Sequence, residues 1–149
     1  MYDLIDRPVA ALRDDARFLL WAMRGWAFTV ERGTCPPLAL CRGFASIDAQ
    51  AALPDFHIAM VLLNRHGRDR IALAPLRCRR IVDHEAVLLA LWRDLSLARF
   101  DKARATLALL VEDTAITPVY RALTAASAKL ALAGCELSQL DLHENRGSM

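Results

Sequence analysis

"PVAALRDDARFLLWAMRGWAFTVERG", residues 8–33, decides the fold, because it predicts a long helix that is apolar on two sides. Pro8 suits the first turn of a helix, and Gly33 suits the stop at its C-terminal end. The first apolar stripe recurs at spacings of three and four, which is the pattern of a helix that buries one face. Its members are Val9, Leu12, Ala16, Leu19, Leu20, Met23, Ala27 and Val30. The charged residues lie off this stripe, and they are Arg13, Asp14, Arg17 and Arg24.

The second apolar side of this helix, here called the aromatic face, consists of Phe18, Trp21 and Phe28. One neighbouring helix cannot cover both sides, so two interpretations stay open. Either the helix runs through the middle of its own bundle, or the aromatic face contacts another molecule. Aromatic residues are enriched at the centres of protein interfaces, and twofold homodimers are the commonest oligomers. We therefore expect self-association through Phe18, Trp21 and Phe28, as a homodimer.

The rest of the chain predicts further helices joined by short turns. Four are expected over 54–65, 83–98, 101–114 and 117–134, with Asp83 and Thr117 as N-caps, and the short segments 37–42 and 46–53 also fit a helical pattern. Residues 56–63 are apolar nearly all round, which indicates a central, buried helix. Short linkers favour antiparallel neighbours. The predicted fold is all-α: one antiparallel helical bundle of five to six helices over residues 1–149, with a partly frayed tail at 135–149.

Composition favours a folded globular chain over disorder, since 55% of the 149 residues are hydrophobic and 24% are charged. The longest uncharged runs, 33–41 and 56–64, have nine residues each, about half of the roughly 18–20 that a membrane span needs. The opening "MYDLIDRPVA" lacks the basic-then-apolar pattern of a secretory signal. We therefore expect a cytoplasmic protein with free thiols.

The stretch "RHGRDRIALAPLRCRRIVDHE", residues 65–85, breaks the helical pattern and predicts an extended connector over residues 68–82. Residues 65–80 hold six arginines and one aspartate, a local net charge of +5 against +2 for the whole chain. Guanidinium groups ahead of a helix N-terminus can bind an anion or a phosphate-bearing ligand, and the candidate residues are Arg77, Arg79, Arg80 and His84.

A solvated connector is the preferred interpretation of the same arginines. Arginine outnumbers lysine 17 to 2 in the whole chain, so it is the ordinary cation of this sequence. Asp83 and Glu85 already place two carboxylates at the predicted helix start, where they offset the helix dipole. The segment has no aromatic residue on which a base could stack, and the overall charge is far from that of a DNA-binding domain. Nucleic acid is therefore not an expected partner.

Sulfur and imidazole ligands suggest a metal-site hypothesis, in which Cys35, Cys41, Cys78 and His84 bind zinc. Five residues separate the members of each pair, whereas a zinc knuckle has two to four. Free cysteine also packs well as a small hydrophobic residue. Structural packing is the competing interpretation, and it implies no cofactor.

Enzymatic signatures are missing from the chain: it has no GxGxxG, P-loop, CxxC, HExxH or GxSxG motif. His57 lies within the apolar run "DFHIAMV", where a core histidine with one hydrogen bond is the expectation. The order of segments, with "DHEAVLLALW" late in the chain, resembles that of small bacterial helical proteins, and this resemblance implies no activity. We therefore expect a small interaction or regulatory module. The alternative is a protein that binds a small anion or a metal at the Arg77–His84 corner, together with Cys35 and Cys41.

Overall fold

Six α-helices make up the computed structural model, which describes residues 4–140. They are α1 (Asp14–Glu31), α2 (Pro36–Ser46), α3 (Leu53–His66), α4 (Asp83–Ser96), α5 (Phe100–Leu110) and α6 (Ile116–Leu132). Short 3-10 turns precede three of these helices, at Val9–Ala11, Gln50–Ala52 and Asp113–Ala115. Within the described residues no segment forms a strand, so the predicted all-α bundle is confirmed.

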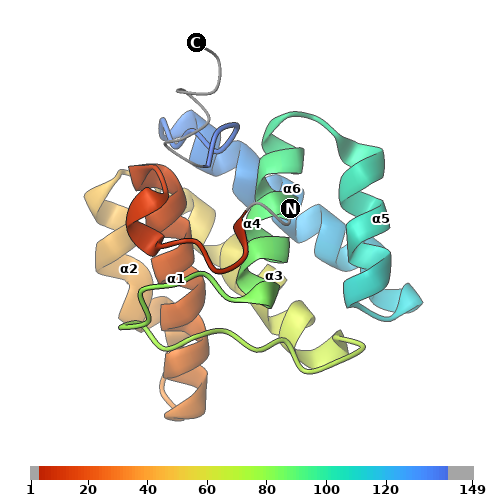
Figure 1. Ribbon diagram of the computed structural model, residues 1–149, viewed down its shortest axis with the longest axis horizontal. Coiled ribbons are helices and arrows are strands. Elements are labelled where there is room, and N and C mark those ends of the chain that lie inside the picture. The colour runs from red at the N-terminus through yellow and green to blue at the C-terminus, as the bar shows by residue number, and fades with distance from the viewer. Residues whose placement is uncertain (1–3, 141–149) are drawn as a thin grey trace.

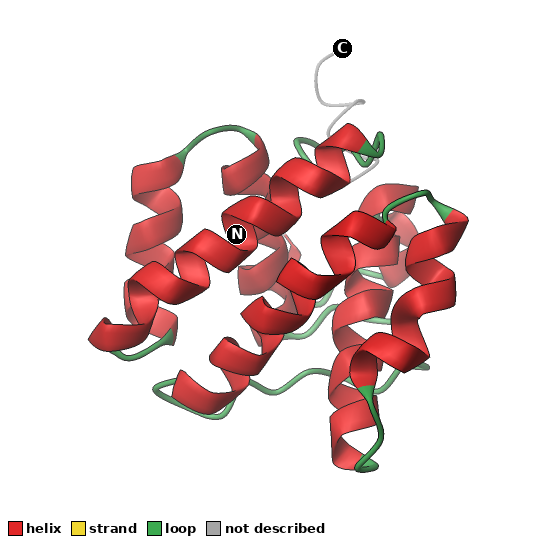
Figure 2. Cartoon of the chain, turned by 180° about the vertical axis from the view of Figure 1, so that it is seen from behind, coloured by secondary structure: helices red, strands yellow, loops and turns green. Residues whose placement is uncertain are grey.

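The helices pack as two groups around α3 and α4. α1 and α2 form a hairpin on one side, while α5 and α6 pack against α4 on the other (Figure 1). α3 and α6 lie side by side along the back of the bundle, as the reverse view shows (Figure 2). The 68–82 connector crosses the front of the molecule over α1 before it enters α4 (Figure 1).

Aromatic rings join the two groups at the centre. The ring of Phe44 on α2 lies 5.4 Å from that of Phe56 on α3, and Phe56 lies 6.2 Å from Trp92 on α4. All three side chains are buried, so each contributes a large apolar area to one continuous core. The expectation that residues 56–63 form a central helix is thus confirmed in its essentials, although Ile58 remains 49% exposed.

The first helix begins later than its sequence pattern predicts. α1 starts at Asp14, because Leu12 and Arg13 are extended after the 3-10 turn at Val9–Ala11. Contacts with distant segments hold this extended backbone. The N–H of Val9 donates to the carbonyl of Arg79 at 2.7 Å, and the N–H of Arg13 donates to the carbonyl of Leu140 at 2.8 Å. Local periodicity does not reveal such long-range bonds.

Other helix boundaries shift by a few residues. α2 extends through Ser46, so the helix expected over 46–53 is reduced to the turn at Gln50–Ala52. The N-cap of α4 is Val82 instead of Asp83, and α6 already begins at Ile116, so Thr117 is not its N-cap. Gly33 and Gly134 have φ angles of +71° and +91°, which matches their expected role in ending helices.

The segment after α6 packs onto the bundle as far as the described residues extend. Cys135, Leu137 and Leu140 are buried, so this stretch of the partly frayed tail predicted over 135–149 is packed against the bundle. The remainder of that prediction, residues 141–149, lies outside the described residues. None of the helices in the described part of the chain is long and apolar enough to span a membrane.

Candidate functional site

A buried ion pair between α1 and α4 organises the front of the molecule. Arg24 is 3% exposed and Glu85 is 0% exposed. The Arg24 Nε–H donates to Glu85 Oε2 at 2.7 Å, and Nη2 donates to Glu85 Oε1 at 2.8 Å. This two-pronged geometry is the strongest form of a charged hydrogen-bond pair. Hydrogen bonding to Glu85 raises the pKa of Arg24 above its ordinary value, although burial opposes the charge.

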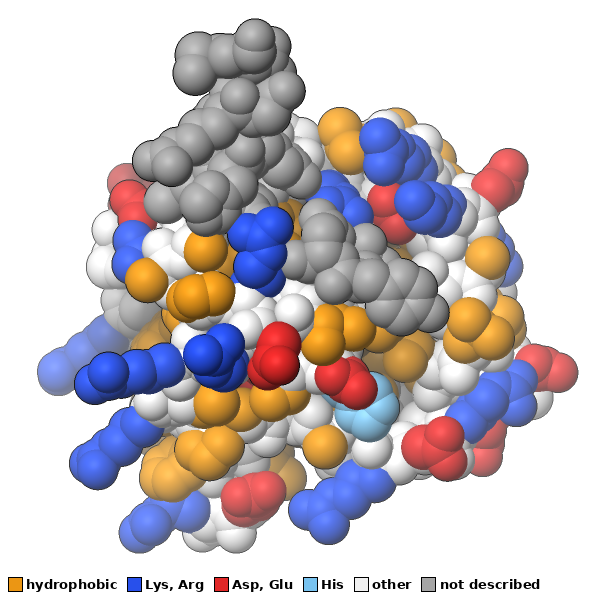
Figure 3. All heavy atoms as spheres, viewed as in Figure 1, with side chains coloured by type: hydrophobic (Ala, Val, Ile, Leu, Met, Phe, Trp, Pro, Cys, Tyr) orange, Lys and Arg blue, Asp and Glu red, His pale blue; other side chains and the backbone are white. Residues whose placement is uncertain are grey.

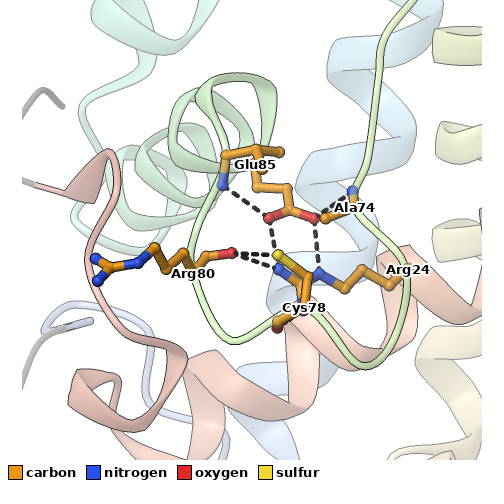
Figure 4. Close-up of polar contacts among 6 residues, drawn as sticks. Arg24, Ala74, Cys78, Arg80 and Glu85 are labelled. Carbon is orange, nitrogen blue, oxygen red and sulfur yellow. Dashed lines mark hydrogen bonds and ion pairs between the residues drawn. The ribbon is translucent and has the colours of Figure 1, made fainter.

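The same two side chains fasten the backbone of the connector (Figure 4). Arg24 donates to the carbonyls of Cys78 at 2.7 Å and Arg80 at 2.9 Å. Glu85 accepts the N–H groups of Ala74 at 2.9 Å and Val82 at 3.0 Å. Each charge therefore has several partners, which a buried ion pair needs in order to offset its loss of hydration. The connector is extended and basic, as predicted, and it is fixed through its main chain.

The sequence pattern places Arg24 off the apolar stripe, together with the other charged residues of the first helix. That placement does not reveal that Arg24 is buried. Arg24 can be buried because the fold brings the carboxylate of Glu85 beside it. One signal was present in the sequence: Glu85 is the third residue of α4, where a glutamate commonly reaches back to the N-cap backbone. Glu85 does this by accepting the Val82 N–H, and it binds Arg24 with the same carboxylate.

The predicted anion-binding residues do not converge on one pocket. Arg77, Arg79 and Arg80 are exposed, and Arg80 Nη1 donates to the carbonyl of Asp6 at 2.9 Å. Basic side chains project outward along the left and lower rim of this face (Figure 3). His84 is half-buried, and its Nδ1 accepts the N–H of Ala72 at 2.7 Å. Among these four residues, the outward arginines match the solvated connector better than a converging anion site.

A hollow of about 540 Å³ does lie at this corner, between the connector and the start of α4. We call it the Cys78–His84 hollow, and it is lined by Ala72, Leu73, Ala74, Pro75, Cys78, Val82, Asp83 and His84. The Cys78 thiol donates to the carbonyl of Arg80 at 3.3 Å. Most of the lining is apolar, and none of the connector arginines is among the lining residues.

The hypothetical zinc ligands are divided between two places. Cys35 and Cys41 are exposed on or next to α2, whereas Cys78 and His84 line the hollow. Within residues 4–140 no group of three or more cysteine, histidine, aspartate or glutamate side chains is arranged to hold a metal ion. The fourth cysteine, Cys135, packs as an ordinary core residue, and burial raises the pKa of its thiol to about 12.

The aromatic face is divided between core and solvent. Phe18 is half-buried, and its ring meets Phe44 edge-on at 5.1 Å. Trp21 lies over Gly43 of α2, where an added Cβ would collide with the indole, and it remains 38% exposed. Phe28 is 47% exposed, with the Arg32 guanidinium 5.5 Å from its ring centre. Trp21 is thus held against α2 with part of its ring facing water, and Phe28 is flanked by Arg32 with about half of its surface exposed.

His57 is half-buried instead of lying in the core, and it has the one satisfied hydrogen bond that was expected. The Trp26 Nε1–H donates to His57 Nδ1 at 2.9 Å, which requires that nitrogen to be unprotonated. Burial lowers the pKa of His57 from its ordinary value of 6.5. His57 is therefore neutral at physiological pH, and its hydrogen bond joins α3 to α1.

Comparison with known proteins finds no relative of this chain. No family model, curated protein or solved structure matches the chain, so the functional argument rests on the geometry described above.

Proposed function

We propose that this protein is an interaction module that forms a homodimer through the outer side of α1. The observation that carries the proposal is the partial exposure of Trp21 and Phe28 on a helix that is otherwise well packed. Trp21 is braced by Gly43 and Phe18, so little side-chain freedom remains for a partner to remove. Rigid, half-exposed aromatic side chains are the typical anchors of protein interfaces.

Charge placement along α1 favours a second copy as the partner. Asp14, Arg17 and Arg32 share the side of the helix that carries Trp21 and Phe28, at 100° per residue. Asp14 lies nine residues before Met23, and Arg32 lies nine residues after it. In an antiparallel pair with its twofold axis at the level of Met23, Asp14 of each copy faces Arg32 of the other. Arg17 of one copy then approaches Phe28 of the other, which suits a cation–π contact.

Sedimentation equilibrium on the wild-type protein and two variants tests the proposal. Trp21→Glu is expected to raise the dimer dissociation constant by at least about tenfold, because it places a charge at the centre of the contact. Its circular dichroism should remain helical. Leu132→Glu is the matched control, since Leu132 is 88% exposed on α6 and should not affect assembly. A Trp21→Glu protein that sediments like the wild-type dimer contradicts the proposal. So does a wild-type protein that is still monomeric at about 100 μM, which is roughly a hundredfold above a micromolar dissociation constant.

Charge reversal tests the antiparallel arrangement separately. Arg32→Glu and Asp14→Arg should each weaken the dimer, because each places like charges opposite one another. The double variant should recover most of the lost affinity. Recovery would identify the partner surface as α1 of the second copy, whereas additive weakening would place Asp14 and Arg32 opposite other groups.

A second candidate function is the binding of a small anionic ligand at the Arg77–His84 corner. The Cys78–His84 hollow favours it by its volume, which lies in the usual range for small-ligand sites, although none of its lining residues is an arginine. Inorganic phosphate is the simplest probe. A rise in melting temperature with phosphate but not with chloride at equal ionic strength, lost in Arg77→Ala/Arg79→Ala, would favour this candidate. Equal effects of both salts would remove it.

A further inference from the structure

The connector presents one edge of its backbone to α4 and leaves the other edge without partners. The N–H groups of Ala72 and Ala74 bond to His84 and Glu85 of α4. Those of Ile71 and Leu73, the alternate residues, have no hydrogen-bond partner within residues 4–140. Alternation of this kind is typical of an extended strand, in which successive peptide groups point to opposite sides. The Ile71–Leu73 edge therefore resembles the open edge of a sheet.

A groove borders this open edge. It encloses about 410 Å³ and is formed by Trp26, Ala27, Val30 and Glu31 of α1, Asn64 of α3, and residues 70–73 of the connector. We call it the connector groove. Trp26 is only 4% exposed and forms a wall of the groove, and a small void of about 30 Å³ continues inward from it. The face drawn in Figure 3 shows hydrophobic side chains in patches between charged ones.

The connector groove lies on the opposite side of α1 from the proposed dimer contact. Val30 follows Trp21 by nine residues, which is about half a turn around the helix at 3.6 residues per turn. A ligand in the groove and a second copy on the aromatic face would therefore not compete for the same surface of α1.

Charge at the rim of the groove indicates the chemistry of its occupant. Arg70 is 88% exposed and its closest acidic neighbour, Glu31, is 3.9 Å away, which is long for an ion pair. Residues 65–80 carry a net charge of +5. A carboxylate on the occupant would contact the Arg70 guanidinium more closely than Glu31 does, and the positive net charge of residues 65–80 would favour its approach.

We propose that the connector groove binds an extended, acidic peptide segment of a partner protein, which adds as a strand to the Ile71–Leu73 edge. Main-chain hydrogen bonds to Ile71 and Leu73 set the alignment of the peptide. Side chains at alternate positions enter the groove against Trp26 and Val30, and a carboxylate meets Arg70. Strand addition of this kind takes affinity from the backbone and specificity from the alternate side chains.

Selection from a random heptapeptide library tests the proposal, with the full-length protein as bait and the Val30→Glu variant as counter-bait. Val30 is 38% exposed, so a glutamate at this position places a carboxylate in the groove and leaves the packing of the core unchanged. The expected peptides alternate apolar residues with others and contain aspartate or glutamate. Their binding should weaken at least about tenfold on Val30→Glu, and it should stay unchanged on Leu132→Glu, the distant control.

N-methylation of the selected peptide gives the decisive readout, because it alters the ligand and leaves the folded protein intact. Methylation at every second residue should weaken binding at least about tenfold, since those N–H groups donate to the carbonyls of Ile71 and Leu73, which lie on the same edge as their N–H groups. Methylation at the intervening residues should have little effect. Three results would overturn the proposal: no peptides that depend on Val30, tolerance of N-methylation at all positions, or selected peptides that bind as helices by circular dichroism.

Discussion

Arg24 and the arginines of the connector make opposite uses of the same side chain. Arg24 is 3% exposed, has a carboxylate partner and binds two carbonyls of the connector. Arg77 and Arg79 are exposed, although each is directly next in the chain to Cys78 or Arg80, whose carbonyls Arg24 binds. The comparison shows that a conspicuous cluster of charges in a sequence need not be the structurally important one. Here Arg24, within α1, holds the connector in place by hydrogen bonds, and the exposed arginines lie on that connector.

Among the substitutions that test this comparison, removing the carboxylate that neutralises Arg24 should lower the free energy of unfolding most. Glu85→Ala leaves a guanidinium buried without a counter-charge and removes the acceptor for the Ala74 and Val82 N–H groups. Breaking a buried pair in this way typically costs about 3–5 kcal/mol. Urea denaturation followed by circular dichroism measures the loss. Asp83→Asn is the matched control on the same helical turn, because Asp83 is exposed, and a similar loss in both variants would show that the pair is not special.

Replacing both members of the pair should cost less than removing Glu85 alone. Arg24→Met with Glu85→Leu removes both charges and keeps apolar volume, and such exchanges are often close to neutral in stability. The four connector bonds are lost as well, so we expect a net loss between that of the control and that of Glu85→Ala. A double-mutant cycle measured by urea denaturation gives the coupling. Simple additivity of the two single losses would contradict a direct Arg24–Glu85 interaction.

Acidification should weaken the hydrogen bond between buried Trp26 and half-buried, neutral His57, and it should lower the free energy of unfolding by a smaller amount. Burial holds the pKa of His57 below 6.5, so the unfolded chain takes up a proton more readily than the folded protein does. Stability contributed by neutral His57 is fully present above pH 6.5 and is lost as the pH falls below that value. The free energy of unfolding at pH 7.5 and pH 5.5 (about one unit on either side of the ordinary value) measures this.

His57→Asn provides the control for the pH prediction. An asparagine carboxamide oxygen can accept the Trp26 N–H in place of Nδ1 and does not titrate in this range. The wild-type protein should therefore lose more stability on acidification than the variant does. An identical pH dependence in both proteins would assign the effect to other groups.

Removing the exposed connector arginines should have the smallest effect. Arg77→Ala and Arg79→Ala are each expected to change the free energy of unfolding by less than about 0.5 kcal/mol, as exposed positions usually do. The same urea titration compares them directly with Glu85→Ala. A loss as large as that of Glu85→Ala would mean that these side chains hold the connector, contrary to the role assigned to Arg24.

Helical periodicity predicted the helices well, because burial of one face leaves a regular trace in the sequence. Residues 54–65 predicted α3 within one residue at each end, and Gly33 and Gly134 were correctly expected to end helices. The start of α1 was not predictable in this way. Its backbone before Asp14 is extended because Val9 and Arg13 bond to residues far along the chain.

The candidate sites show the same difference between features that local sequence patterns predict and features that depend on contacts between distant segments. Sequence alone identified the aromatic side of the first helix, the basic connector and the single hydrogen bond of His57. It could not place Arg24 against Glu85, since 61 residues separate them and neither position breaks the helical pattern. It left open whether Cys78 and His84 share a site and whether the connector arginines line it, whereas the structure shows the two residues in one hollow whose lining contains none of those arginines.

The sequence by itself thus determined the all-α class, the approximate helices and the separation of apolar from charged surfaces, because these follow from local propensity and periodicity. Only the tertiary structure decided which arginine is buried, which edge of the connector is paired and how much of Trp21 and Phe28 stays exposed. The physical reason is that hydrogen-bond partners and burial depend on which segments meet in space. For Arg24, that meeting with Glu85 turns a side chain of surface type into the main attachment of the connector.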